Sequence, residues 1–408
     1  MRWPGGWQRA LAVLLAIVGM QRVGAQPEDL GRVGRLPQRP PPHGFWLSDV
    51  LLHRVAFFDA KRQTMLGTIT SGSANVGFVI HPVFSRERGE IYLPETYYSR
   101  GVRGERSDVV TVYDAATLEP LAEIPIPPHR GEYFAGAAAN ALSDDGRFLA
   151  VFNVTPATSL SIVDTIARRF VTEVETPGCS LVYGAGVRRF FMLCANGEAL
   201  VVTLDATGMP ETITRTTAFF DPDTDPVMEK AVRADDRWYF VSFEGRIHEV
   251  DVSGAELQFT RPWALLDAAD AGWRVGGQQP LAVHARSRGL YVLMHQGGID
   301  THKAAGTQIW VYDLANRRRA LRFPLDNPLV AFLGQQAGLA RDGWTRALLR
   351  LVLPNPGVSA ILVTQDDEPV LIAAAQEPPN LSVHDARTGA LVGEIRDAGL
   401  ALGLLFAP

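Results

Sequence analysis

The sequence has little cysteine, no excess of positive charge and no recognisable catalytic motif, and each shortage narrows what the protein can be. Two cysteines, Cys179 and Cys194, occur in 408 residues. Two thiolates cannot hold a zinc ion or an iron–sulfur cluster without further ligands, and the next histidine along the chain, His248, follows Cys194 by 54 positions. The net charge of −5 offers no electrostatic basis for binding nucleic acid or an anionic membrane. We therefore expect no metal site, no nucleic-acid partner and no membrane partner.

Motifs for enzymatic chemistry are also missing. The chain has no Gly-x-Ser-x-Gly sequence, and nothing ties a serine to a histidine and an aspartate. Gly276–Gly277 is not followed by a helical pattern that would present its amides to a phosphate. The acidic stretch Asp221–Asp225 lacks the glycine and the terminal glutamate of a calcium loop, and we expect His302, in a polar loop, to be a structural residue. The residues alone predict no catalytic, cofactor-binding or metal-binding side chain.

One apolar run stands out, at the N-terminus. Leu11–Met20 follows two arginines and precedes the small residues Val23–Ala25. We interpret residues 1–25 as a secretory signal peptide rather than a membrane anchor, and residues 26–43 as an irregular, proline-rich arm. No other stretch reaches the ~18 apolar residues of a spanning helix. Export favours a disulfide between the two cysteines.

The most informative feature that is present is a repeat of two short strands joined by a turn that begins with aspartate. In Thr111–Asp114, apolar positions alternate and the aspartate is placed to bond the turn amides. The average spacing of the copies is about 54 residues, near the roughly 40–50 residues of one propeller blade. Because one such aspartate recurs in each copy, we expect turn capping and not acid–base chemistry. The repeats end on Asp59, Asp114, Asp164, Asp205, Asp251, Asp313 and Asp385.

The ends of the chain predict how the ring closes. Phe45–Ile69 supplies three strands of a blade that lacks its inner strand, and Leu400–Phe406 is an apolar strand without a blade. Pairing the two removes an exposed sheet edge. The fold class is therefore all-β, with residues 44–408 forming a seven-bladed β-propeller closed by its N- and C-terminal strands. Two stretches exceed the blade rhythm, Trp263–Gln279 and Asp326–Pro356, and both are expected to be partly helical excursions on a propeller face.

The spacing of the two cysteines also makes a specific prediction. If Ser180–Tyr183 and Arg189–Cys194 pair as antiparallel strands with Tyr183 opposite Phe190, Cys179 falls opposite Cys194. Opposed residues at neighbouring strand ends approach within disulfide range. We therefore predict a Cys179–Cys194 disulfide.

Three stretches, together with the cysteine pair, resemble the heavy subunit of quinoprotein amine dehydrogenases, the family of methylamine and aralkylamine dehydrogenases. The similarity runs from about Phe45 to the C-terminus. It implies a seven-bladed propeller in a periplasmic complex of two heavy and two light subunits. The three stretches are Ser99–Asp108, Asp270–Gln279 and Thr301–Thr307.

By this resemblance the chemistry belongs to a partner. A cysteine-rich light chain carries tryptophan tryptophylquinone, oxidises a primary amine to aldehyde and ammonia, and passes the electrons to a blue copper protein. The heavy chain, without a cofactor of its own, forms part of the substrate-channel wall. Phe78, within the unusually long segment Gly67–Ser85, is a candidate wall residue. The alternatives are a secreted propeller that only binds ligands or proteins, and a propeller lactonase, whose metal-binding residues are not discernible.

Overall fold

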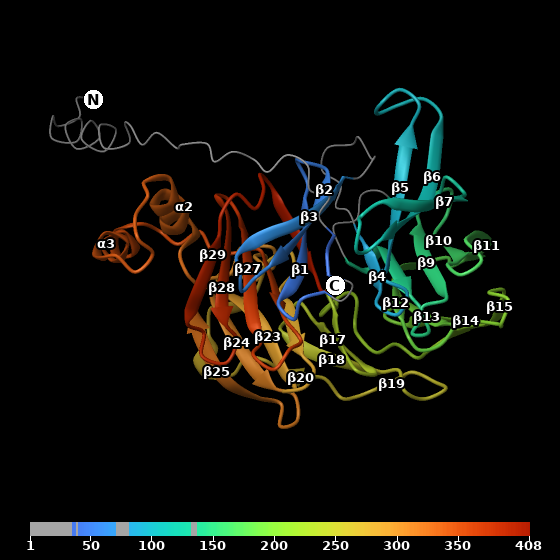
Figure 1. Cartoon of the computed structure of the whole chain (residues 1–408). Coiled ribbons are helices and arrows are strands. Elements are labelled where there is room, and N and C mark those ends of the chain that lie inside the picture. The colour runs from blue at the N-terminus through green and yellow to red at the C-terminus, as the bar shows by residue number, and fades with distance from the viewer. Residues whose placement is uncertain (1–34, 38–39, 71–80, 132–136) are drawn as a thin grey trace, which may run out of the picture.

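A computed structural model describes residues 35–37, 40–70, 81–131 and 137–408. Its strands form seven antiparallel sheets around a common axis (Figure 1), which confirms the predicted seven-bladed propeller. The blades, each written from its inner strand outward, are β30 (Leu402–Phe406), β1 (Gly44–Asp49), β2 (Arg54–Asp59), β3 (Thr64–Thr70); β4 (Val83–Ser85), β5 (Glu90–Tyr98), β6 (Arg106–Asp114), β7 (Pro120–Ile126); β8 (Asn140–Leu142), β9 (Phe148–Asn153), β10 (Ser159–Asp164), β11 (Arg169–Glu175); β12 (Cys179–Gly184), β13 (Arg189–Cys194), β14 (Ala199–Leu204), β15 (Pro210–Arg215); β16 (Val232–Ala234), β17 (Arg237–Val241), β18 (Arg246–Asp251), β19 (Gln258–Phe259); β22 (Leu281–His284), β23 (Gly289–Gln296), β24 (Gln308–Asp313), β25 (Arg318–Pro324); and β26 (Ala360–Val363), β27 (Val370–Gln376), β28 (Pro379–Asp385), β29 (Leu391–Ile395).

The ring closes through the two ends of the described chain, as predicted. β30 pairs with β1, so Phe406 lies opposite Trp46 and Leu405 opposite Leu47. The seam is covered by an apolar cluster in which fully buried Leu402 packs with residues of the first and last blades, including Phe58. The C-terminal strand is therefore the inner strand of the first blade.

The repeated aspartates shape the outer hairpin of each blade. Asp114 accepts hydrogen bonds from the amides of Ala116 and Thr117, both at 2.8 Å, and the other six accept from the amide two residues on in the same way. In five of the seven turns the fourth residue past the aspartate takes a left-handed conformation, for example Leu118 (φ 60°) and Gly389 (φ 77°). This is a turn followed by a left-handed residue, a common hairpin connection. The prediction that each aspartate caps its own turn is confirmed.

Two excursions leave the blade pattern. Trp263–Gln279 contains two extra edge strands, β20 (Trp263–Ala264) and β21 (Trp273–Val275), and a 3₁₀ turn, η2 (Ala268–Asp270). A second 3₁₀ turn, η1 (Ala137–Ala139), precedes β8.

The other excursion, between β25 and β26, forms two helices, α2 (Pro328–Gln336) and α3 (Trp344–Val352). The left-handed Gly338 (φ 64°) ends the first helix, so the helical spacing does not run through unbroken. Neither helix, nor any other in the part of the chain described, is long and apolar enough to cross a membrane.

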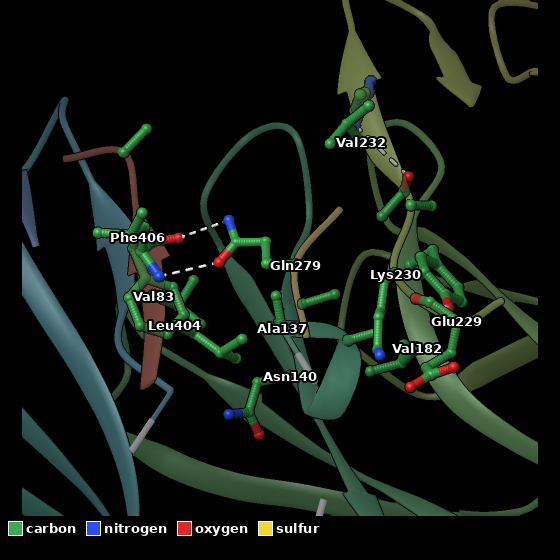
Figure 2. A pocket seen from close by; sticks show the side chains of 18 of the residues that line it. Val83, Ala137, Asn140, Val182, Glu229, Lys230, Val232, Gln279, Leu404 and Phe406 are labelled. Atoms are coloured by element: carbon green, nitrogen blue, oxygen red, sulfur yellow. Dashed lines mark hydrogen bonds between the residues drawn. The ribbon is translucent and has the colours of Figure 1, made fainter. Parts of the chain in front are cut away.

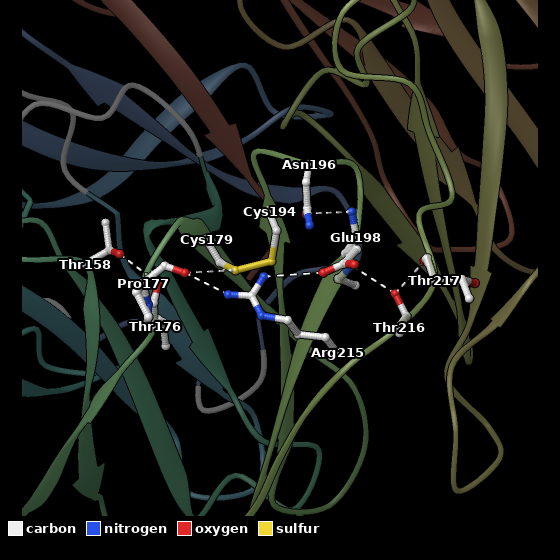
Figure 3. Close-up of a disulfide and its surroundings, with 11 residues drawn as sticks. Thr158, Thr176, Pro177, Cys179, Cys194, Asn196, Glu198, Arg215, Thr216 and Thr217 are labelled. Atoms are coloured by element: carbon white, nitrogen blue, oxygen red, sulfur yellow. Dashed lines mark hydrogen bonds and ion pairs between the residues drawn. A yellow bond between two sulfur atoms is a disulfide. The ribbon is translucent and has the colours of Figure 1, made fainter.

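The fourth blade carries the predicted disulfide. Cys179 and Cys194 lie opposite each other at the ends of β12 and β13 and are covalently bonded (Figure 3). The assumed register is nevertheless wrong inside the hairpin, because Tyr183 lies opposite Phe191 and not Phe190. A bulge after Ser180 shifts the pairing by one residue. The predicted pairing of the two cysteines is therefore correct, although the predicted pairing of Tyr183 is not.

Candidate functional site

A cavity of about 420 Å³ lies where the inner strands converge. Its apolar walls include Val83, Val182 and Leu404, which come from three different blades. Figure 2 shows Phe406 and Leu404 on one side of this space and Lys230 on the other. The cavity is therefore built by residues that become neighbours only when the ring closes.

Gln279 makes hydrogen bonds to the strand that closes the ring. Its side-chain amide donates to the carbonyl of Leu405 and accepts from the amide of the same residue, both at 2.9 Å (Figure 2). The side chain thus pairs with β30 as a strand backbone would. Its own backbone amide donates to Ser359 just before β26, and its carbonyl accepts from Ile361 within β26. One glutamine therefore links the sixth blade to both the seventh and the first.

Lys230 brings charge to the cavity wall. Its Nζ donates to the carbonyl of Gly277 at 3.3 Å. Burial lowers the pKa of this ammonium below its ordinary value; the carboxylate of Glu229 partly opposes that shift, and the positive charge of Lys303 adds to it. The adjacent Glu229 carbonyl accepts a hydrogen bond from the buried Tyr183 hydroxyl at 2.7 Å. The site can hold a polar or negatively charged group beside an apolar wall.

One of the three stretches that carry the resemblance, Asp270–Gln279, reaches this cavity, and it packs against a second stretch, Thr301–Thr307. Within Asp270–Gln279, Gly277 holds Lys230 and the last two residues line the wall. A side chain at Gly276 would collide with the Ala304 carbonyl and the His295 ring, so only glycine allows this segment to approach Thr301–Thr307 so closely. Gly276 thus serves a close approach of two loops, which the sequence did not predict.

His295 joins the same two loops. Its Nε2 lies 2.7 Å from the hydroxyl of Thr301. Burial lowers the pKa of this imidazole, and the charge of Arg274 lowers it further. His295 is thus held in its neutral form near pH 7, where it fixes the loop.

His302, expected to be a structural residue, packs its ring edge-on against that of Phe243, with 5.1 Å between the ring centroids. Its Nδ1 is buried, and no hydrogen-bond partner for it lies among the described residues. The role is structural, but it is made by ring packing.

The remaining stretch, Ser99–Asp108, lies elsewhere. It forms the exposed tip of the long β5–β6 hairpin and the first residues of β6, and this hairpin projects from the ring in Figure 1. Next to the tip, Arg106 donates to both oxygens of Asp108 at 2.9 and 2.8 Å and to the carbonyl of Arg130. The charged loop thus projects from the ring and is not a part of the cavity.

A buried carboxylate supports the same hairpin. Glu95 is fully buried and accepts hydrogen bonds from Thr111 and from Tyr97. Burial raises the pKa of Tyr97 to about 12, with the charge of Glu95 adding to the shift. No sequence pattern singled out Glu95, because the alternation of the strand predicts only that its side chain faces one side of the sheet.

The other candidates are placed as follows. Asp221 accepts from the amides of Asp223 and Thr224, and Asp225 binds Ser242, so the acidic stretch is a hydrogen-bonded turn. Within the described ranges, no group of three or more His, Cys, Asp or Glu side chains is placed to hold a metal. Phe78 lies outside the described residues. Lys230 and Glu229 were missed by sequence reasoning, because a single Glu-Lys pair carries no spacing signal.

The fold and cavity define a seven-bladed β-propeller whose inner strands enclose a partly charged axial cavity and whose ends close the ring. The chain belongs to the methylamine dehydrogenase heavy chain family, whose family model matches residues 51–332.

Curated relatives agree with that assignment. A methylamine dehydrogenase heavy chain of Methylophilus methylotrophus is 25% identical over 355 residues, covering 85% of this chain and 78% of the relative. The heavy chain of Methylobacillus flagellatus is 27% identical, with coverages of 84% and 78%. That of Paracoccus versutus is 26% identical, with coverages of 78% and 68%.

Solved structures show the same fold at lower identity. A protein of unknown function from Desulfotomaculum acetoxidans superposes with a TM-score of 0.55 at 11% identity, covering 89% of this chain and 99% of that one. A dihydro-heme d1 dehydrogenase gives a TM-score of 0.52 at 17% identity, with coverages of 91% and 77%. At these identities the likeness concerns the architecture alone.

Proposed function

We propose that the chain is the heavy subunit of a periplasmic amine dehydrogenase that oxidises primary amines to aldehyde and ammonia. The observation that carries this is the family match over residues 51–332, together with relatives aligned over most of both chains. The heavy chain serves as scaffold and channel wall. Tryptophan tryptophylquinone on a separate, cysteine-rich light chain supplies the electron acceptor for the amine, and a blue copper protein receives the electrons.

The chain's own residues fit a supporting role. In the cavity wall, Lys230 and Glu229 place an ammonium and a carboxylate beside apolar side chains. These groups can orient a polar partner or substrate group and exclude water. We propose that the two packed loops Asp270–Gln279 and Thr301–Thr307, the first of which reaches the cavity, face the light chain. Phe78 stays a proposed channel residue, with Phe78→Ala expected to shift the preference among amines and leave quinone formation intact.

Copurification tests this assembly. The tagged chain, coexpressed with the light-chain gene of the same genome and exported, is expected to bring down the cysteine-rich chain, and native mass spectrometry should give two heavy and two light subunits. Omitting the light-chain gene is the control. Failure to capture such a chain contradicts the proposal and favours a propeller that only binds other ligands.

A further inference from the structure

The axial cavity carries two opposite charges that are not paired with each other. Lys230 and Glu229 both line it, and among the described residues they form no hydrogen bond or ion pair with each other. An ammonium carries several N–H donors, and Lys230 uses one of them, toward the Gly277 carbonyl at 3.3 Å. The Glu229 carboxylate accepts no hydrogen bond from the part of the chain described. Both groups are therefore available to a ligand.

The other polar groups near these charges are already engaged. Arg233, the remaining charged side chain that the structure describes in this wall, donates to both oxygens of Asp144 at 2.7 and 2.8 Å. The indole N–H of Trp238 donates to the carbonyl of Gly184 at 2.8 Å. The charge that the wall offers to a ligand is therefore one ammonium and one carboxylate.

The opposite side of the cavity is apolar. Val83, Leu404 and Phe406 lie across the cavity from Lys230 in Figure 2, and the last two of these apolar side chains are buried. The volume of about 420 Å³ falls within the roughly 300–1,000 Å³ of small-molecule sites, and the cavity is partly open to solvent. A ligand that matches all three walls has a negative group, a positive group and an apolar part.

We propose that the axial cavity binds a free α-amino acid with an apolar side chain, with its carboxylate at Lys230 and its ammonium at Glu229. The side chain of the amino acid then lies against Val83, Leu404 and Phe406. A ligand with a single charge fits less well, because it displaces water from both wall charges and gives a partner to only one of them. This inference goes beyond the amine dehydrogenase function, since it concerns a site built by this chain alone.

Titration calorimetry with matched small molecules tests the site. The full exported chain, purified without a light chain, is expected to bind L-leucine. Isocaproate, which lacks the amino group, and isoamylamine, which lacks the carboxylate, should each bind roughly tenfold more weakly or worse. L-serine, which lacks the apolar side chain, should also bind roughly tenfold more weakly. The proposal is wrong if neither L-leucine nor L-phenylalanine binds, or if either single-charge analogue binds as tightly as L-leucine.

Two substitutions test the two charges separately. Lys230→Met should weaken L-leucine binding roughly tenfold or more and leave that of isoamylamine unchanged, whereas Glu229→Gln should weaken L-leucine similarly and leave isocaproate unchanged. Lys61→Met, at an exposed lysine outside the cavity, is the matched control and should change binding by less than about twofold.

An unchanged melting temperature shows that each variant folds. Equal effects of K230M and K61M on L-leucine binding overturn the proposal, as does a K230M variant that loses L-leucine and isoamylamine to the same extent. The comparison of analogues uses the natural chain, so it decides the question even where a variant does not fold.

Discussion

Single aspartates set the shape of the outer hairpins, and their role was readable from the sequence because each acts on amides two or three residues away. Lys230 was not readable in this way. Its neighbours Gly277 and Lys303 are more than 40 positions away along the chain, and only the packing of adjacent blades brings them together. Contacts between residues close in sequence, such as the turn caps, were thus predictable. Contacts between residues of different blades, such as those of Lys230, were not.

Asp251 offers a pH test of the local account. Hydrogen bonds from Ser253 and Arg237 lower its pKa to about 2. A carboxylate with a lowered folded-state pKa contributes stability above its unfolded pKa, and this contribution is lost as the pH falls from about 4 to about 2. Asp251→Asn is therefore expected to lower the free energy of unfolding by about 1 kcal/mol at pH 7, a value reduced for solvent screening.

Urea unfolding at pH 7 and pH 2.5 measures this. The cost of D251N should shrink at the lower pH. Asp205→Asn is the comparison variant: hydrogen bonds from Thr207 and Met209 lower the Asp205 pKa as well, so D205N should show the same trend, and its difference from D251N isolates the contact with Arg237. A cost for D251N that does not change with pH contradicts the account.

At the scale of elements, the repeated pattern of alternating apolar residues predicted the hairpins, but it did not predict the bulges or the breaks between helices. The bulge after Ser180 moves Tyr183 by one position, and period-two alternation carries no signal for such an insertion. The helical spacing in the Asp326–Pro356 excursion indicated helix, but the folding of this segment into two helices depends on Gly338 and on the pairing of Arg346 with Glu394.

The disulfide is expected to stabilise the fourth blade. Replacing both cysteines, Cys179→Ala with Cys194→Ala, should lower the free energy of unfolding by roughly 3 kcal/mol for a loop of this size. Denaturant titration of the variant, with the dithiothreitol-reduced natural chain as the control, measures the loss. Two titratable thiols in the unfolded, unreduced natural chain would show that the bond is absent.

The buried Arg346–Glu394 pair is expected to hold α3 in place. Arg346→Met leaves Glu394 buried without its main partner, which costs about 3–5 kcal/mol in such sites, so the helix should detach locally. Hydrogen exchange should then show lost protection in α3. The double variant R346M/E394Q removes the stranded charge and should recover much of the protection. Equal exchange in the two variants is the result that contradicts this.

At the scale of the whole molecule, the seven repeats predicted both the number of blades and the closure by the chain ends. They did not predict the cavity, because its lining comes from short inner strands and loops with little pattern. The two hydrogen bonds between the Gln279 side chain and the backbone of Leu405, here called the Gln279 clamp, are an example. A side chain takes the place of a neighbouring strand there, and no periodicity in the sequence indicates such a contact.

Closure should be essential for folding. Removing residues 398–408 deletes β30 with buried Leu402, Leu404 and Leu405, at a cost of roughly 1.5–3 kcal/mol for each side chain. The summed cost for the three side chains approaches the free energy of unfolding of a typical domain, which is about 5–15 kcal/mol. We expect the truncated chain to aggregate. Gln279→Ala, which removes only the clamp, should fold with a lower melting temperature. A truncated chain that stays monomeric and melts within a few degrees of the intact one contradicts the closure.

The central claim is that the chain supports amine oxidation without performing it. The most direct measurement is amine-dependent reduction of an artificial electron acceptor by the purified heavy–light complex and by this chain alone, with several primary amines. The account predicts that the complex reduces the dye only when an amine is present, and that the chain alone gives no activity. Amine-dependent reduction by the isolated chain, or none by a complex with an intact quinone, would contradict it.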